Sequence, residues 1–422
     1  MIQIENIRKN ITFAYCDNRY VRQRLVVELN CNLDRNTMTG TALLAYVLSS
    51  ATARHRDIVS LSRYLDQLYG ATLYVSGHRV GTRMVLHLDT DCVSDRYLPD
   101  DNVGMDSTRL LCEVLTEPYL PNGSFSENII DVEGEKLREE IRFLINDKES
   151  YCTRMLLNEF FKDSVRSLPS LGFEEDIDGI DGDMLLRIYR DCLSACNVNV
   201  FYCGDNREAV RETILTMIEN YGIGVSGIDF RNDPAVLPES PFYIQEDVGA
   251  EQDIISMLLH SAKIPDEKDL AALKIANAIL GGMPTSRLFT NVREKEGLCY
   301  SCVSNRMTGG GSGILIEAST SKEKHLKSRD RIIKEFETLR DQGPSQDELK
   351  NAKRSLINST RSVFDTVSGT SSHYLAAVNS MRRYMTPEEE IELTENVSGE
   401  DVMRCLSEMK YCGMYRLTDE EE

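Results

Sequence analysis

The sequence of 422 residues has no tryptophan, only six histidines and no long apolar segment. No stretch approaches the roughly 18 apolar residues that a membrane-spanning helix needs. The first eight residues, Met1 to Arg8, are charged and lack the apolar core of a signal peptide, so secretion is not expected. The twelve cysteines are scattered rather than grouped as in a small secreted domain, which predicts reduced thiols and a cytoplasmic protein.

Positive charge is also scarce, since 48 Lys and Arg face 68 Asp and Glu, for a formal net charge of −20. This charge argues against nucleic-acid binding, because that function depends on a surface rich in Lys and Arg. A hydrophobic content of 41% with 27% charged residues is typical of a soluble globular protein. The chain is too long for one hydrophobic core, so two or more domains are expected.

Hydrophobic periodicity predicts the same order of elements in both halves of the chain. In the first half, alternation predicts strands at 11–16, 23–30, 73–76, 84–89 and 198–202, and helical spacing predicts helices at 42–49, 59–68, 107–116 and 125–145. In the second half, the corresponding strands are 242–246, 254–260, 300–305 and 314–318, and the helices are 268–279, 285–295, about 322–340 and about 345–365.

The two halves share a local pattern as well. Residues 62–65 read Ser-Arg-Tyr-Leu and lead to Gly70 and a hairpin, and residues 286–289 read Ser-Arg-Leu-Phe and lead to Gly297 and a hairpin. The repetition predicts an α+β fold of two similar lobes with a cleft between them. Residues 221–240 are rich in Gly, Asp and Pro and form the predicted linker, so the lobes are predicted at 1–220 and 241–422.

The most informative motif follows Ser-Arg-Leu-Phe and reads Val-Arg-Glu-Lys-Glu-Gly-Leu-Cys-Tyr-Ser over residues 292–301. It predicts a helix that ends near Lys295, a turn at Gly297 and a strand from about Tyr300. Arg293 and Tyr300 lie seven positions apart across this turn, so both side chains can point at one spot. The alternative is that Arg293 is only a helix-end cation that meets the helix dipole, and Tyr300 an ordinary strand residue.

This motif resembles the second-lobe signature of the pitrilysin/insulinase metallopeptidases, Ser-Arg-Leu-Phe followed by Arg-Glu-x-x-Gly-Leu-x-Tyr. In that family, the Arg and the Tyr reach across a closed chamber to the scissile peptide group. The resemblance covers most of the chain and implies a clam-shell of two lobes around a chamber, each lobe a layered sheet-and-helix unit. It also implies that Arg293 and Tyr300 bind the substrate.

The family's first lobe binds zinc on an H-x-x-E-H helix, where the two His face one way and the Glu activates the metal-bound water. Here the His positions fall on Leu43 and Val47, and the Glu position falls on Tyr46. Aliphatic side chains cannot bind zinc, and no two of the six histidines are spaced i, i+4. Glu140 matches the family's third ligand and Glu133 the Glu seven residues before it. We therefore expect no metal in this chain and a solvated or chamber-lining carboxylate at Glu140.

Within the family, the chain resembles most the zinc-less proteins associated with aminopentanol modification of elongation factor P. Residues 42–48, 65–71 and 147–151 carry this likeness. Such proteins are thought to pair with a zinc-bearing relative. The resemblance implies a non-catalytic subunit of a heterodimeric zinc peptidase, inactive by itself, whose homologous partner supplies zinc and the general base. The implied substrates are peptides, held as an added β-strand by the metal-bearing lobe.

Two alternatives belong to other functional classes. The chain is a scaffold or a peptide-binding pseudoenzyme if the Arg293 and Tyr300 pair has no function. A self-sufficient hydrolase finds little support, because there is no G-x-S-x-G motif and spacing alone singles out no Cys/His arrangement. The C-x-x-C of Cys299 and Cys302 enters a predicted strand rather than a helix N-terminus, so these cysteines are predicted to be structural.

Overall fold

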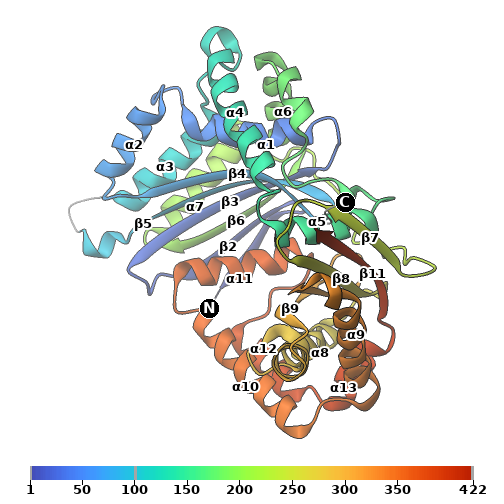
Figure 1. Ribbon diagram of the computed structural model, residues 1–422. Helices are drawn as coiled ribbons and strands as arrows, with labels where there is room; N and C mark the ends of the chain where they lie inside the picture. Colours follow the sequence, from blue (N-terminus) through green and yellow to red (C-terminus); the bar gives the residue numbers. More distant parts are fainter. Residues whose placement is uncertain (1, 99–101, 420–422) are drawn as a thin grey trace. The chain divides into compact units, whose positions relative to one another are not determined.

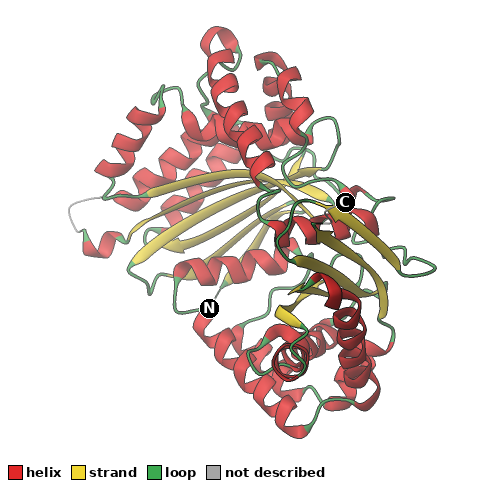
Figure 2. Cartoon of the chain, in the orientation of Figure 1, coloured by secondary structure: helices red, strands yellow, loops and turns green. Residues whose placement is uncertain are grey.

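The computed structural model describes residues 2–98 and 102–419 and contains two β-sheets, each covered by helices (Figures 1 and 2). The chain divides into two compact units. Unit 1 comprises residues 1–142, 168–231 and 364–379, and unit 2 comprises residues 143–167, 232–363 and 380–422. Each unit thus takes one short segment from a distant part of the sequence. The predicted division of the chain at residues 221–240 stays a prediction.

Unit 1 is built on a six-stranded sheet with the order β1-β2-β6-β3-β5-β4. Its strands are β1 (Gln3–Arg8), β2 (Ile11–Asp17), β3 (Arg22–Asn32), β4 (Thr72–Val80), β5 (Arg83–Val93) and β6 (Cys196–Gly204). Alternate residues of the central strand β3, namely Leu25, Val27 and Leu29, are fully or almost fully buried in the main core of this unit. That core lies between the sheet and the helical layer.

Helices cover both faces of this sheet. The larger layer consists of α1 (Met38–Ser50), α2 (Ile58–Gln67), α3 (Val103–Thr116), α4 (Glu127–Phe143), α6 (Gly182–Ser194) and α7 (Arg207–Asn220). On the opposite face, α11 (Val367–Asn379) packs on β3 and β6 (Figure 1). The rings of Tyr374 on α11 and Phe201 on β6 lie 5.7 Å apart, which fixes this helix on the sheet.

Unit 2 is built on a five-stranded sheet with the order β7-β11-β8-β10-β9. Its strands are β7 (Phe242–Asp247), β8 (Asp253–Ser261), β9 (Cys299–Met307), β10 (Ser312–Thr320) and β11 (Lys410–Thr418). Its helices are α5 (Lys148–Phe160), α8 (Glu267–Asn277), α9 (His325–Gln342), α10 (Gln346–Val363), α12 (Pro387–Asn396) and α13 (Gly399–Ser407), with π-helical turns η5 (Ala278–Gly282) and η6 (Leu288–Lys295). Helix α5 packs on β8 and β11, whereas α8 packs on β9 and β10.

The two sheets repeat one topology. In unit 1, β2 is parallel to β6, and β6, β3, β5 and β4 follow with antiparallel pairing. In unit 2, β7 is parallel to β11, and β11, β8, β10 and β9 follow in the same way. The pattern of pairs matches strand for strand, with β1 added at one edge of unit 1. The predicted α+β fold of two similar layered units is confirmed.

Two glycines mark the repeated turn that the sequence indicates. Gly70 (φ 68°) and Gly297 (φ 57°) both adopt the left-handed conformation after a helix and before a hairpin. A residue without a Cβ takes that conformation at no steric cost, which explains why glycine occupies both turn positions. None of the helices in residues 2–98 and 102–419 combines the length and the apolar character needed to span a membrane.

Candidate functional site

The positions that match the family's zinc ligands lie in unit 1, on helix α1. Leu43 is fully buried and Val47 is 3% exposed, and both belong to the main core of this unit. Nearly every residue of α1 is buried, because this helix lies between the sheet and the other helices. The two aliphatic side chains are therefore packing residues and offer a metal no lone pair.

Tyr46, at the position of the family's glutamate, has a different environment. Its side chain is half-buried, and its hydroxyl donates a hydrogen bond to the carboxylate of Glu140, an exposed residue of α4. Burial, followed by the hydrogen bond to Glu140, raises the pKa of Tyr46 well above its usual value. The phenol is thus neutral and is held as a donor to Glu140.

The carboxylate of Glu133, the second one in this region, also has a hydrogen-bond partner. Glu133 is 5% exposed and accepts hydrogen bonds from the Lys136 ammonium on the next turn of α4, with Nζ–O distances of 2.8 and 2.9 Å. The residues present do not fit a zinc ion, since two ligand positions are hydrocarbon and Glu140 is bound by Tyr46. Within residues 2–98 and 102–419, no three His, Cys, Asp or Glu side chains gather where a metal ion can be held.

The other candidate residues lie in unit 2, where η6 leads into β9. The end of η6 is a π-helical turn, in which the Glu296 N–H donates to the Asn291 carbonyl at 3.3 Å. Two further bonds close the turn, from the Gly297 N–H to the Arg293 carbonyl at 3.2 Å and from the Leu298 N–H to the Val292 carbonyl. π-Helical turns are rare and are frequent at functional sites.

The two arginines of the motif differ in their surroundings. Arg287, which precedes η6, has a side chain only 12% exposed and forms a bidentate ion pair with Glu348, at 2.7 and 2.9 Å. Arg293 is exposed, and its guanidinium carbon lies 4.7 Å from the centre of the Phe289 ring. Among the described residues, no carboxylate forms an ion pair with Arg293. Arg287 therefore ties the start of η6 to α10, whereas the guanidinium of Arg293 lies over the Phe289 ring and is exposed.

Tyr300 is the second residue of β9, an edge strand of its sheet. In the pairing with β10, Ser319 faces Ser301 and Thr320 faces Cys299, so Tyr300 is the extra residue of a β-bulge. Its side chain is 62% exposed, whereas Cys299 beside it is buried. Bulges often occur next to functional sites, because they redirect a side chain.

Arg293 and Tyr300 therefore share three properties. Both are exposed, both lie at a local irregularity of the backbone, and the elements that carry them, η6 and β9, pack against each other. A guanidinium and a phenol are both hydrogen-bond donors, suited to a carbonyl oxygen or a carboxylate. The sequence motif predicts a role for both residues, which stays a prediction, but it indicates neither the bulge nor the contact between Tyr46 and Glu140.

Comparison with protein families gives one match. Residues 179–356 match the family described as "Peptidase M16 inactive domain". Among curated proteins, the chain is 24% identical over 383 residues to "Probable inactive metalloprotease YmfF" of Bacillus subtilis, covering 90% of this chain and 89% of that protein. It is also 23% identical to an "Uncharacterized zinc protease" of Rickettsia bellii, covering 67% of this chain and 68% of that protein.

Solved structures share the fold over the full length. A conserved protein from Enterococcus faecalis superposes with a TM-score of 0.88 at 21% identity, covering 100% of this chain and 99% of that chain. A peptidase M16 inactive domain from Pseudomonas fluorescens superposes with a TM-score of 0.82 at 16% identity, covering 100% and 98%.

Proposed function

The chain is an inactive homologue of the M16 metallopeptidases, the pitrilysin/insulinase family, and from this premise we propose that it is the non-catalytic subunit of a heterodimeric zinc peptidase. Its partner is a homologous subunit with an intact H-x-x-E-H helix, which supplies the zinc and the general base. This chain contributes Arg293 and Tyr300 to the binding of a peptide substrate.

The observation that carries the proposal is the exposure of Arg293 and Tyr300 at two backbone irregularities. A π-helical turn and a β-bulge each replace a regular hydrogen-bonding pattern and have to be offset elsewhere. Here they surround two side chains that are mostly in solvent. Since neither residue fills a core or closes a described ion pair, packing alone gives no reason for this arrangement.

The chemistry of the two side chains suits peptide hydrolysis. When water attacks a peptide carbonyl, negative charge grows on the carbonyl oxygen. Donors aimed at that oxygen stabilise the transition state more than the ground state. Arg293 would donate from its guanidinium and Tyr300 from its phenol, once a substrate is enclosed. The exposure of both donors in this structure is compatible with a site that is completed by substrate.

The test uses the purified chain together with a zinc-bearing H-x-x-E-H relative from the same organism. We expect no cleavage of fluorogenic peptides by this chain alone and chelator-sensitive cleavage by the complex. In the complex, Arg293→Ala or Tyr300→Phe should each lower kcat/KM on the order of 10²–10³-fold, as does loss of one oxyanion donor. Matched controls are Arg354→Ala, an exposed arginine of α10, and Tyr243→Phe, an exposed tyrosine of β7.

Two outcomes contradict the proposal. If both site variants keep kcat/KM within about threefold of the parent complex, no transition-state contact is lost, and a scaffold or a peptide-binding pseudoenzyme becomes the better conclusion. If the chain alone cleaves peptides in a chelator-sensitive way, it is not a non-catalytic subunit. Thermal melts of each variant separate a loss of catalysis from a loss of folding.

A further inference from the structure

The twelve cysteines of the chain are all free thiols, and some of them lie in contact. In three pairs, the neighbouring thiol is the largest influence on the pKa of a cysteine: Cys16 with Cys203, Cys31 with Cys192, and Cys299 with Cys302. The first pair joins two strands of unit 1. Cys16 is the last buried residue of β2, and Cys203 is its register partner on the parallel strand β6.

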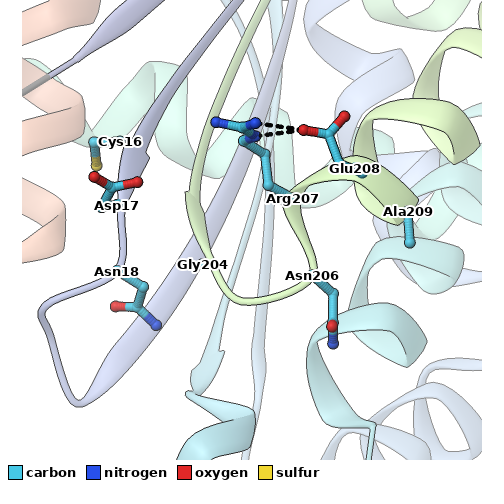
Figure 3. A pocket seen from close by; sticks show the side chains of 8 residues that line it. All are labelled: Cys16, Asp17, Asn18, Gly204, Asn206, Arg207, Glu208 and Ala209. Atoms are coloured by element: carbon cyan, nitrogen blue, oxygen red, sulfur yellow. Dashed lines mark hydrogen bonds and ion pairs between the residues drawn. The ribbon is translucent and has the colours of Figure 1, made fainter.

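This first pair also lies at a pocket. A cavity of about 490 Å³ opens between the end of β2 and the start of α7, and Figure 3 shows the side chains that line it. The lining residues are Cys16, Asp17, Asn18, Gly204, Asn206, Arg207, Glu208 and Ala209. Cys16 itself is 7% exposed, and Cys203, beside it on β6, is fully buried. Neither the Cys31 nor the Cys299 pair lines this pocket. Cys16 is therefore the member of the pair that borders the pocket, although most of its surface is covered.

The backbone spacing of the pair allows a disulfide. Paired strands lie about 4.7–4.9 Å apart, and a disulfide needs Cα atoms about 4.4–6.8 Å apart. Cys16 and Cys203 project from the same face, because in-register partners on neighbouring strands do so. Oxidation therefore requires no large movement of either strand.

The pKa shifts of the two thiols favour Cys16 as the one that reacts first. Contact with the Cys203 thiol lowers the pKa of Cys16 and the Arg19 charge supports this shift, while burial and the Asp17 charge oppose it. The same contact, together with burial, raises the pKa of Cys203. Of the two, Cys16 is thus the better nucleophile, and it is also the one that lines the pocket.

We propose that Cys16 and Cys203 form an oxidisable dithiol that a small hydroperoxide, entering through the pocket, converts reversibly to a disulfide. The Cys16 sulfur attacks one peroxide oxygen and the O–O bond breaks, so that Cys16 becomes a sulfenic acid and the other oxygen leaves as water or an alcohol with the thiol proton. The Cys203 sulfur then attacks the Cys16 sulfur, the S–S bond forms, and the hydroxyl group leaves as water with the Cys203 proton. Two thiols lose two electrons in total, and one hydroperoxide is reduced.

The proposal is independent of the peptidase function, and the chain provides its own controls. The reduced full chain is treated with hydrogen peroxide, quenched with iodoacetamide at intervals, digested with trypsin and examined by mass spectrometry. The proposed bond joins peptides 10–19 and 191–207, whereas the closed pair Cys31 and Cys192 would join peptides 25–35 and 191–207. The pair Cys299 and Cys302 would form a bond within peptide 296–306.

We expect the link between peptides 10–19 and 191–207 to form about tenfold faster than the other two, because access and thiolate character set the rate. Dithiothreitol should reverse it. In Cys203→Ala, dimedone should label a sulfenic acid at Cys16, and the control Cys31→Ala should form the Cys16–Cys203 bond at the parent rate. Equal rates at all three pairs, or oxidation of Cys16 to a sulfinic acid without a link, would overturn the proposal. If a variant does not fold, the rates of disulfide formation at the three pairs in the parent protein are enough to decide between these outcomes.

Discussion

A buried histidine in unit 2 should make the stability of this protein depend on pH. His260 lies on the central strand β8, is fully buried, and neither ring nitrogen has a hydrogen-bond partner among the described residues. The Phe160 ring lies 5.0 Å away, and the backbone of the hairpin near Gly311 closes over the imidazole. Burial lowers the pKa of His260 to about 4; the Gly309 backbone opposes this shift and the nearby charge of Arg166 supports it.

The direction of the effect follows from proton linkage. The unfolded chain binds a proton at this histidine near pH 6.5, whereas the folded chain does so only near pH 4. Stability is therefore fully present above pH 6.5 and is lost as the pH falls from 6.5 to 4, because only the unfolded state takes up the proton in this window. The total is about 3 kcal/mol, of which about 2 kcal/mol is lost between pH 7.5 and pH 5.0.

The assay compares the parent chain with His260→Leu and His260→Gln in urea unfolding at pH 7.5 and pH 5.0. The chain has no tryptophan, so far-UV circular dichroism is the natural signal. Between the two pH values, each variant should lose about 2 kcal/mol less stability than the parent, because neither side chain titrates. A difference below a few tenths of a kcal/mol for both variants would refute the reasoning. A flattened profile for His260→Leu alone would assign the effect to packing instead of titration.

Two other predictions concern the candidate site. The purified chain, dialysed without chelator, should contain far less than one zinc per chain by elemental analysis, since Leu43 and Val47 occupy two ligand positions; about one zinc per chain would contradict this. Arg287→Ala should lower the free energy of unfolding by about 1–3 kcal/mol, because Glu348 loses a bidentate charged partner, whereas Arg293→Ala should cost at most about 1 kcal/mol. Equal costs for the two arginine variants in urea unfolding would show that Arg293 is structural too.

Regular alternation and helical spacing were enough to predict most of the strands and helices before the end of α10. The predicted strand at 23–30 is β3, and the predicted helices at about 322–340 and 345–365 are α9 and α10. The sequence patterns did not indicate β11, since this strand lies between β7 and β8 and is buried on both faces, so it shows no alternation. They also missed α11, which is rich in Ser and Thr and whose helical state depends on packing against β3 and β6.

The candidate site was predictable only where it is local in sequence. The turn at Gly297 follows from the motif itself, because a glycine after a helix marks a left-handed C-terminal residue. The bulge at Tyr300 depends on the register of β9 against β10, which comes from residues about 18 positions further along the chain. The bond between Tyr46 and Glu140 likewise depends on how α1 packs beside α4. Contacts of this kind come from tertiary structure and leave no periodic signal.

The physical roles of the two sets of candidate residues are opposite. Leu43 and Val47 stand where a metal would be held, and burying such side chains stabilises a fold by about 1.5–3 kcal/mol each. Histidine at these two positions would place imidazoles in the core, beside a Glu140 that already accepts a hydrogen bond from Tyr46. The fold itself therefore accounts for Leu43 and Val47. It does not account for Arg293 and Tyr300, whose exposed side chains contribute little to stability. The kinetics of an assembled complex is therefore the measurement that tests whether these two residues bind substrate.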